Sequence, residues 1–273
     1  MLLKRTVYRI SIPLISKKRI THFSDTHLTL FDSLSTPEEI ETAKKQTKAW
    51  EEVRQGFLGS FERHPTKEQS LPPEVHFQNL IAECSLSDFA LLTGDILDLT
   101  SPANLRFAEK TLQNLPRFGY VCGNHDRPEG FDENYPTLFS TAKPLQVFDL
   151  GDLLLLGIDN GGGSITEQTL EETRLLLAEK KPTLLFLHMP LVTEENRPFF
   201  QAGCDDYYLF NKPGAPEIND AFTRLVTDKK SPVFGVMAGH LHFPTHTFLR
   251  EGLPQFTVAQ GISGYYNEYL IGE

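Results

Sequence analysis

The sequence has few cysteines and no long apolar run. Its three cysteines, Cys84, Cys122 and Cys204, are odd in number and widely spaced, so they predict no disulfide framework and favour a reducing compartment. No stretch approaches the roughly 20 apolar residues that a membrane span requires. The basic first residues contain neither the apolar core nor the cleavage site of a signal peptide. We therefore expect a cytoplasmic protein without a membrane partner.

Positive charge is also scarce. Lys and Arg number 26 against 36 Asp and Glu, which gives a formal net charge of −10. Such a chain is a poor general binder of nucleic acid, because phosphate backbones attract Lys and Arg. A small anion can still bind where a site carries its own positive charge. With 40% hydrophobic and 23% charged residues over 273 positions, the composition excludes a disordered or fibrous protein.

Short apolar runs followed by polar residues predict buried β-strands at 19–24, 88–93, 117–122, 182–187 and 232–238. Helical patterns lie between them. Ser101 and Pro102 begin one helix, Ser164 or Thr166 begins another, and Asn219 begins a third. The runs 145–150 and 153–158 form a hairpin, which indicates mixed sheets. Strands that alternate with helices predict a layered α/β fold.

A polar cluster directly follows each of the five strand runs. The clusters are Asp-Thr-His at 25–27, Gly-Asp-Ile-Leu-Asp at 94–98, Gly-Asn-His-Asp at 123–126, His188, and Gly-His-Leu-His at 239–242. Ligands bind at this edge of open α/β sheets, and residues i and i+2 of an extended segment face the same side. Oxygen and imidazole donors without a thiolate suit Mn, Fe or Zn. Each motif alone is weak, but the five together predict a metal site.

In this order the motifs D-x-H, G-D-x-x-D, G-N-H-D, H and G-H-x-H resemble those of the calcineurin-like metallophosphoesterase superfamily, over Arg19 to about Tyr266. The resemblance implies one domain over 1–273, folded as a four-layer α/β/β/α sandwich with two mixed sheets. It also implies two divalent metal ions. One would be held by Asp25, His27, Asp95 and His242, and the other by Asp95, Asn124, His188 and His240.

The same resemblance implies the catalytic roles. A hydroxide that bridges the two ions would attack phosphorus, and His125, oriented by Asp98, would contact the phosphate and protonate the leaving oxygen. Asn124 and His125 would bind the substrate; Arg127 either joins them or is a solvated surface residue. We expect a phosphodiesterase or phosphomonoesterase for a small phosphorylated substrate, such as a nucleotide or cyclic nucleotide. Residues 158–190 are loosely similar to small bacterial cyclic-nucleotide phosphodiesterases.

Residues 32–80 form a helical insertion. Thr36, Pro37 and Glu39 match a capping box. Apolar residues then recur at helical spacing: Ile40, Ala43, Trp50, Val53, Phe57 and Phe61. This amphipathic helix either packs on the core, which is the simpler interpretation, or forms a cap that contacts the leaving group of the substrate.

Two alternatives to an enzyme of this type stay open. A scaffold protein can keep such a fold without turnover, but here all seven ligand positions and His125 hold suitable residues. A nuclease is disfavoured by the acidic composition. The remaining histidines have no such partners in the sequence and are expected to be structural or solvated: His22, His64, His76 and His246.

Overall fold

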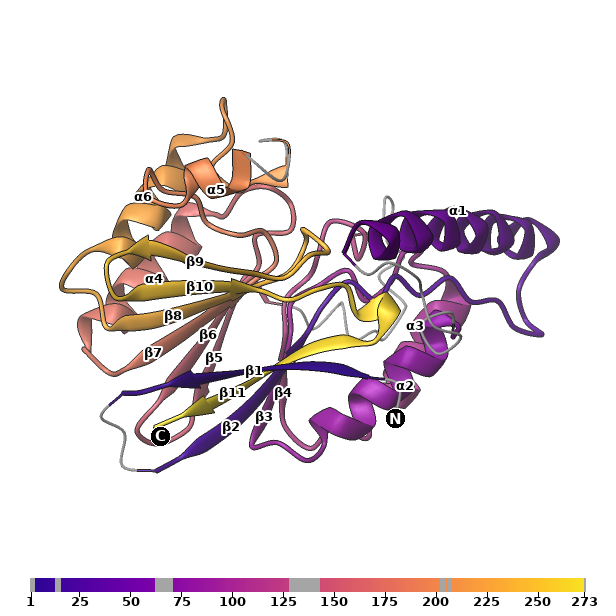
Figure 1. The fold of residues 1–273 in the computed structure, drawn as a ribbon, viewed down its shortest axis with the longest axis horizontal. Coiled ribbons are helices and arrows are strands. Elements are labelled where there is room, and N and C mark those ends of the chain that lie inside the picture. Colours follow the sequence, from indigo (N-terminus) through magenta and orange to yellow (C-terminus); the bar gives the residue numbers. More distant parts are fainter. Residues whose placement is uncertain are drawn as a thin grey trace.

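The computed structural model describes residues 3–12, 16–61, 71–127, 143–201, 205 and 208–272, with only the backbone for 53–61. Two mixed β-sheets are stacked on one another (Figure 1). The first has the order β1-β11-β2-β3-β4, with bounds Lys4–Ile10, Tyr265–Ile271, Lys18–Phe23, Phe89–Leu92 and Phe118–Tyr120. The second has the order β5-β6-β7-β8-β10-β9, with bounds Leu145–Asp149, Leu154–Ile158, Thr183–Leu187, Val233–Ala238, Leu253–Thr257 and Thr245–Arg250.

The strands that precede the polar clusters run parallel within each sheet. Strand β3 pairs with β2 and β4 in parallel, and β7 pairs with β6 and β8 in parallel. Their carboxyl ends therefore lie at one edge of each sheet. Strands β5 and β6 form the predicted antiparallel hairpin, and β11 and β9 add further antiparallel pairings. Both sheets are mixed, as predicted.

Helices cover the outer face of each sheet, which completes four layers. They are α2 (Pro73–Cys84) and α3 (Pro102–Leu112) on the first sheet, and α4 (Glu167–Ala178) and α6 (Glu217–Thr227) on the second. On β3, Leu92 packs outward against the α2–α3 layer, whereas Leu91 packs inward. On β7, Leu185 packs outward and Phe186 packs inward, in one apolar cluster with Leu91. The predicted sandwich is thus confirmed.

Two predicted helix starts are confirmed and one is wrong. The backbone N–H of Asn104 donates to Ser101 Oγ at 3.3 Å, and that of Thr169 donates to Thr166 Oγ1 at 3.1 Å. Helix α6 begins at Glu217 rather than at Asn219. Asn219 lies buried inside the helix, where its side-chain amide donates to the carbonyls of Gly163 and Phe210. Its side chain tethers the helix instead of capping it.

The predicted insertion begins with α1 (Pro37–Phe61), which lies on the side of the molecule that carries α2 and α3 (Figure 1). The capping box is confirmed, because the N–H of Thr36 donates to Glu39 Oε2 and the N–H of Glu39 donates to Thr36 Oγ1. Ala43 is buried and Trp50 is half-buried. The described part of the chain does not include residues 62–70 of the insertion or the side chains of Val53, Phe57 and Phe61.

Short elements complete the chain: α5 (Arg197–Gln201) and the 3-10 turn η3 (Gly261–Ser263). Within the described ranges, no helix has both the length and the apolar character needed to cross a membrane.

Candidate metal centre

The five polar clusters meet at the carboxyl edge of the two sheets. Asp25 and His27 follow β2, Asp95 and Asp98 follow β3, Asn124 and His125 follow β4, His188 follows β7, and His240 and His242 follow β8. Of the predicted ligands, the first sheet thus supplies the two carboxylates, the amide and one imidazole, and the second supplies three imidazoles. All seven predicted ligands lie together, although they span more than two hundred positions of the sequence.

The predicted ligands form two adjoining groups. Asp25, His27 and His242 can place one ligand atom each within 4.8 Å of one another, and so can Asp95, His188 and His240. In the first group, His242 Nε2 lies 3.4 Å from Asp25 Oδ1 and 3.1 Å from His27 Nε2.

The second group is equally compact. His188 Nε2 lies 3.4 Å from Asp95 Oδ2, 3.1 Å from Asn124 Oδ1 and 3.0 Å from His240 Nδ1. Asp95 also lies 3.9 Å from His27 Nε2, so its carboxylate stands between the two groups. This is the position that a bridging ligand needs.

The backbone of these loops is held in an uncommon conformation. Five predicted ligands adopt positive φ, between 42° and 69°: Asp25, His27, Asp95, His240 and His242. In the described part of the chain only one other non-glycine residue, Lys180, does so. Such residues are energetically unfavourable and concentrate at functional sites. The fold therefore holds the backbone of these five ligand residues in a locally strained conformation.

Glycine lets the backbone segments approach the carboxylates closely. A Cβ added to Gly123 would lie 2.0 Å from Asp95 Oδ1, and one added to Gly239 would lie 2.0 Å from Ser24 Oγ and 2.9 Å from Asp25 Oδ2. No larger residue fits there without a shift of the ligand loops. Glycine at both positions therefore allows the close approach of the neighbouring loops.

The electrostatics of the centre favour positive charge. Burial raises the pKa of Asp95, but the neighbouring imidazoles, His188 first, outweigh it and hold that pKa well below its usual range. Burial lowers the pKa of His188, but Asp95 and then Asp25 raise it to about 9. Burial and the charge of His188 lower the pKa of His240 to about 3, which leaves its imidazole neutral. The carboxylate of Asp95 is thus ionised and the imidazole of His240 is neutral, as a bound cation requires, whereas His188 would release its proton when a cation binds.

His125 and Asp98 form a pair beside the ligand groups. His125 Nδ1 lies 3.0 Å from Asp98 Oδ1, and His27 Nδ1 lies 3.5 Å from the same oxygen. Burial lowers the pKa of His125, but the hydrogen bond to Asp98 and the nearby carboxylates raise it above its ordinary value. The backbone N–H of His125 donates to Asp95 Oδ1 at 2.8 Å. The pair is therefore anchored to the centre through main chain as well as side chain.

The other predicted residues lie apart from the ligand groups. Arg127 forms an ion pair with Asp159 and is not among the residues that line the cavity over the ligands, so its predicted contact with substrate stays a prediction. His22 is buried and bonds to Thr93 and Tyr269, which is the structural role expected. His246 stacks on Phe256 in the second sheet. His64 and Cys204 lie outside the described residues.

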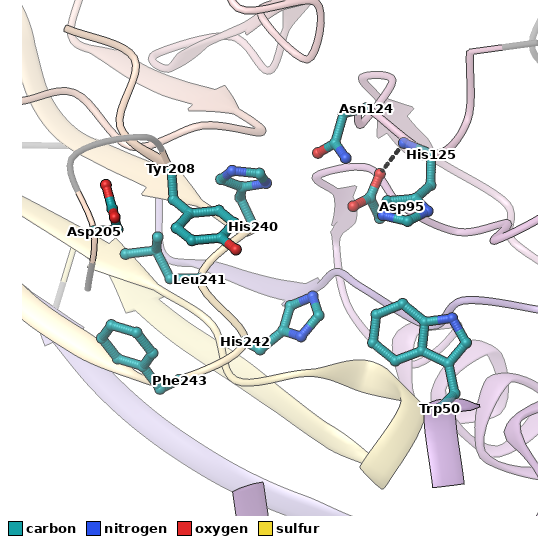
Figure 2. A pocket seen from close by; sticks show the side chains of 10 residues that line it. All are labelled: Trp50, Asp95, Asn124, His125, Asp205, Tyr208, His240, Leu241, His242 and Phe243. Atoms are coloured by element: carbon teal, nitrogen blue, oxygen red, sulfur yellow. Dashed lines mark hydrogen bonds between the residues drawn. The ribbon is translucent and has the colours of Figure 1, made fainter. Parts of the chain in front are cut away.

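A cavity of about 520 Å³ opens over the predicted metal ligands (Figure 2). Sequence reasoning placed Trp50 on the insertion helix, and the structure places it in the wall of this cavity. Other wall residues were missed altogether: Asp205, Tyr208, Leu241 and Phe243. A signal existed for two of them, because Leu241 and Phe243 alternate with the ligand histidines 240 and 242. Tyr208 and Asp205 follow α5 and carry no motif.

The model of the calcineurin-like phosphoesterase family matches residues 18–244. The chain belongs to this family. It is therefore a metallophosphoesterase of the hydrolase class, and its clustered Asp and His side chains are candidates for metal binding. No curated protein matches the sequence significantly.

Solved structures resemble this phosphoesterase at low sequence identity, and the first of them shares its fold. A dimetal phosphatase from Danio rerio is 11% identical with a TM-score of 0.55, over 90% of this chain and 88% of that one. A purple acid phosphatase from yellow lupin seeds is 15% identical with a TM-score of 0.48, over 91% of this chain and 44% of that one. The phosphopantetheinyl hydrolase of Mycobacterium tuberculosis is 15% identical with a TM-score of 0.43, over 89% of this chain and 90% of that one.

Proposed function

We propose that this phosphoesterase holds two divalent metal ions and hydrolyses a small phosphorylated substrate, a monoester or a diester. The observation that carries the proposal is the pair of adjoining ligand groups with Asp95 between them. One ion would be held by Asp25, His27, Asp95 and His242. The other would be held by Asp95, Asn124, His188 and His240.

Two buried atoms support the fit of these residues to cations. Asp25 Oδ1 and His240 Nε2 have no hydrogen-bond partner among the described residues. His242 Nε2 lies 3.4 Å from the Asp25 oxygen, but a buried carboxylate oxygen that accepts no well-formed hydrogen bond is costly unless a cation meets it. The donor set of carboxylate, amide and imidazole without thiolate suits Mn, Fe or Zn. His125 can also approach Asp95 and His27, but its Nδ1 faces Asp98, so we assign it outside the ligand sets.

When bound, a pair of divalent ions neutralises charge on a phosphoryl group and lowers the pKa of water that attacks it. The chain keeps the centre electropositive, because Asp25 and Asp95 are the only two carboxylates among the seven proposed ligands. Two carboxylates offset half the charge of two divalent ions. An anionic substrate is then attracted despite the net charge of −10.

The proton for the leaving oxygen would come from His125. Asp98 accepts the Nδ1–H of His125, which fixes the tautomer and leaves Nε2 as the atom that carries the transferable proton. The raised pKa keeps the imidazole protonated up to a higher pH than that of a free histidine. This is the requirement for a general acid at neutral pH.

We propose further that the whole chain is one domain that works in the cytoplasm. One apolar cluster takes residues from both sheets, for example Leu91 and Phe186, which supports a common core. The described cysteines, Cys84 and Cys122, are unpaired and buried, in keeping with a reducing compartment.

Metal analysis with matched variants tests the proposal. Purified protein is stripped, reloaded with Mn, Fe or Zn in turn, and analysed for metal content and for hydrolysis of aryl phosphate monoesters and diesters. We expect two ions per chain and turnover with at least one metal. His240→Gln should lose one ion, whereas His246→Gln, which changes a histidine outside the ligand groups, should keep both. A protein that takes up no metal, or takes up metal without turnover of any phosphoester, contradicts the proposal.

A further inference from the structure

The cavity over the proposed ions has two different ends. Trp50 stands at one end, and Tyr208 and Asp205 stand at the other, with His240 and His242 between them (Figure 2). Its volume of about 520 Å³ lies in the range of small-molecule sites. A phosphoryl group over the ions would therefore leave room for a leaving group along these walls.

The Trp50 end is a fixed aromatic wall. The indole stacks on the imidazole of His27, with ring centroids 3.8 Å apart and an angle of 25° between the rings. It also lies 5.4 Å from the ring of His242 and 6.0 Å from the ring of His125. These contacts hold a side chain of the insertion helix against the predicted ligands. Trp50 is the only tryptophan of the chain.

Leucine and aromatic side chains form much of the remaining wall. Leu241 and Phe243 flank the ligand histidines, and Leu241 packs in a small apolar cluster with Phe200 and Leu209. The ring of Tyr208 lies 5.8 Å from that of His240. An aromatic or other planar group can contact such walls over much of its surface.

The part of the wall that the structure describes is poor in charge outside the metal centre. Among the described residues that line the cavity there is no Lys or Arg, and Asp205 is the one charged side chain outside the site motifs. Arg127, the cation that directly follows the G-N-H-D motif, is paired with Asp159. A second anionic group on a substrate would therefore meet apolar surface or a carboxylate, at a cost in desolvation or repulsion.

From these walls, and resting on the proposed function, we infer the substrate class. The site selects a substrate with one phosphoryl group on a planar, apolar leaving group that carries no further negative charge. Aryl phosphates meet this description directly, and nucleoside monophosphates and cyclic nucleotides meet it through the planar base that their ribose carries. Nucleoside di- and triphosphates and sugar bisphosphates do not. Trp50 is the residue that supplies the specificity for a planar group.

Phosphonates test this inference without turnover, because their carbon–phosphorus bond is not hydrolysed. Three probes form a matched set: methylphosphonate, phenylphosphonate and 4-phosphonobenzoate, which adds a carboxylate to the ring. Binding to metal-loaded protein is followed by calorimetry and by the fluorescence of Trp50. We expect phenylphosphonate to bind about tenfold more tightly than methylphosphonate and to change the emission of Trp50. We expect 4-phosphonobenzoate to bind more weakly than phenylphosphonate.

Variants locate the effect. Trp50→Ala should remove most of the preference for phenylphosphonate over methylphosphonate in calorimetry. Asp205→Lys should improve binding of 4-phosphonobenzoate about fivefold relative to phenylphosphonate. Glu172→Lys changes charge equally on the exposed surface of α4 and should leave this ratio unchanged.

The outcomes separate this inference from the proposed function. Equal binding of methyl- and phenylphosphonate, or tighter binding of 4-phosphonobenzoate, overturns the inference while the metal-dependent phosphoesterase stands. A protein that binds no metal and no phosphonate overturns both. An unchanged preference in Trp50→Ala contradicts the role assigned to that residue.

Discussion

Replacement of His125 by asparagine tests the assignment of the general acid. The substitution removes the imidazole but keeps the backbone N–H that donates to Asp95 Oδ1 at 2.8 Å. None of the seven proposed ligands is changed. Because the His125 side chain is 38% exposed, its loss leaves no buried cavity. We therefore expect His125→Asn to fold and to bind both ions like the parent protein.

The rate of the variant should depend on the leaving group. A positioned general acid contributes about 10²–10⁴-fold, which corresponds to about 3–5 kcal/mol of activation free energy. This full loss is expected for an alkyl phosphoester, whose alkoxide leaves poorly. For a p-nitrophenyl ester, whose anion leaves without a proton, the loss should be much smaller. The assay is kcat on the two esters, with metal content measured on the same preparations.

Two results would contradict the role of His125 as the general acid. An equal loss on both esters would show that His125 acts on binding or on the metal centre rather than on the leaving oxygen. Loss of metal from His125→Asn would place the imidazole among the ligands. Either result would require a different group to donate the proton.

Other substitutions probe the neighbouring features. Asp98→Asn removes a carboxylate that raises the pKa of His125. For substrates with poor leaving groups, the alkaline fall in kcat should therefore occur at a lower pH than in the parent protein. An alkaline fall at the same or a higher pH would contradict the role of the Asp98–His125 pair. Asp95→Ala should abolish binding of both ions, and retention of both in metal analysis would overturn the bridging assignment. Gly123→Ala should displace Asp95, lower metal content and destabilise the fold by about 1–3 kcal/mol in denaturant unfolding. Gly162→Ala, where an added Cβ meets only the Arg127 side chain at 3.4 Å, is the matched control and should change neither measurement.

The site could be predicted from the sequence because its parts repeat one local rule. Each apolar strand run ends in polar residues, and parallel strands bring those ends to a common edge. Asp25, Asn124 and His240 could thus be placed together without knowledge of the order of the strands. The strained backbone of the loops could not be predicted, because the motifs fix which residues are present and not their φ.

Strands β11 and β9 could not be predicted from the sequence because each buries polar side chains. Strand β11 buries Asn267 and Glu268, which a pattern of apolar residues excludes. Asn267 donates to the hydroxyl of Tyr269, and Glu268 pairs with Arg19 on β2. Strand β9 buries Thr245 and Thr247 on the same face as Leu249, whereas Phe248 on the opposite face is exposed. Only the tertiary partners of these side chains explain their positions.

The sequence left two alternatives open for the helix that carries the aromatic wall, a helix packed on the core or a cap beside the site. Helical spacing predicted that Trp50 faces inward with Ala43, and the structure agrees in placing both toward the molecule. It could not show that the inward face of this helix meets His27, because no local pattern records the packing of an insertion. Tyr208 lies still further from any motif, yet it faces Trp50 across the cavity.

Anomalous X-ray scattering can show whether Asp95 joins two ions in one centre. Crystals of protein loaded with Mn or Zn are measured on both sides of the absorption edge of the metal. We expect two anomalous peaks on either side of the Asp95 carboxylate, one beside Asp25 and His242 and the other beside His188 and His240. A single peak, or peaks remote from Asp95, would contradict this expectation.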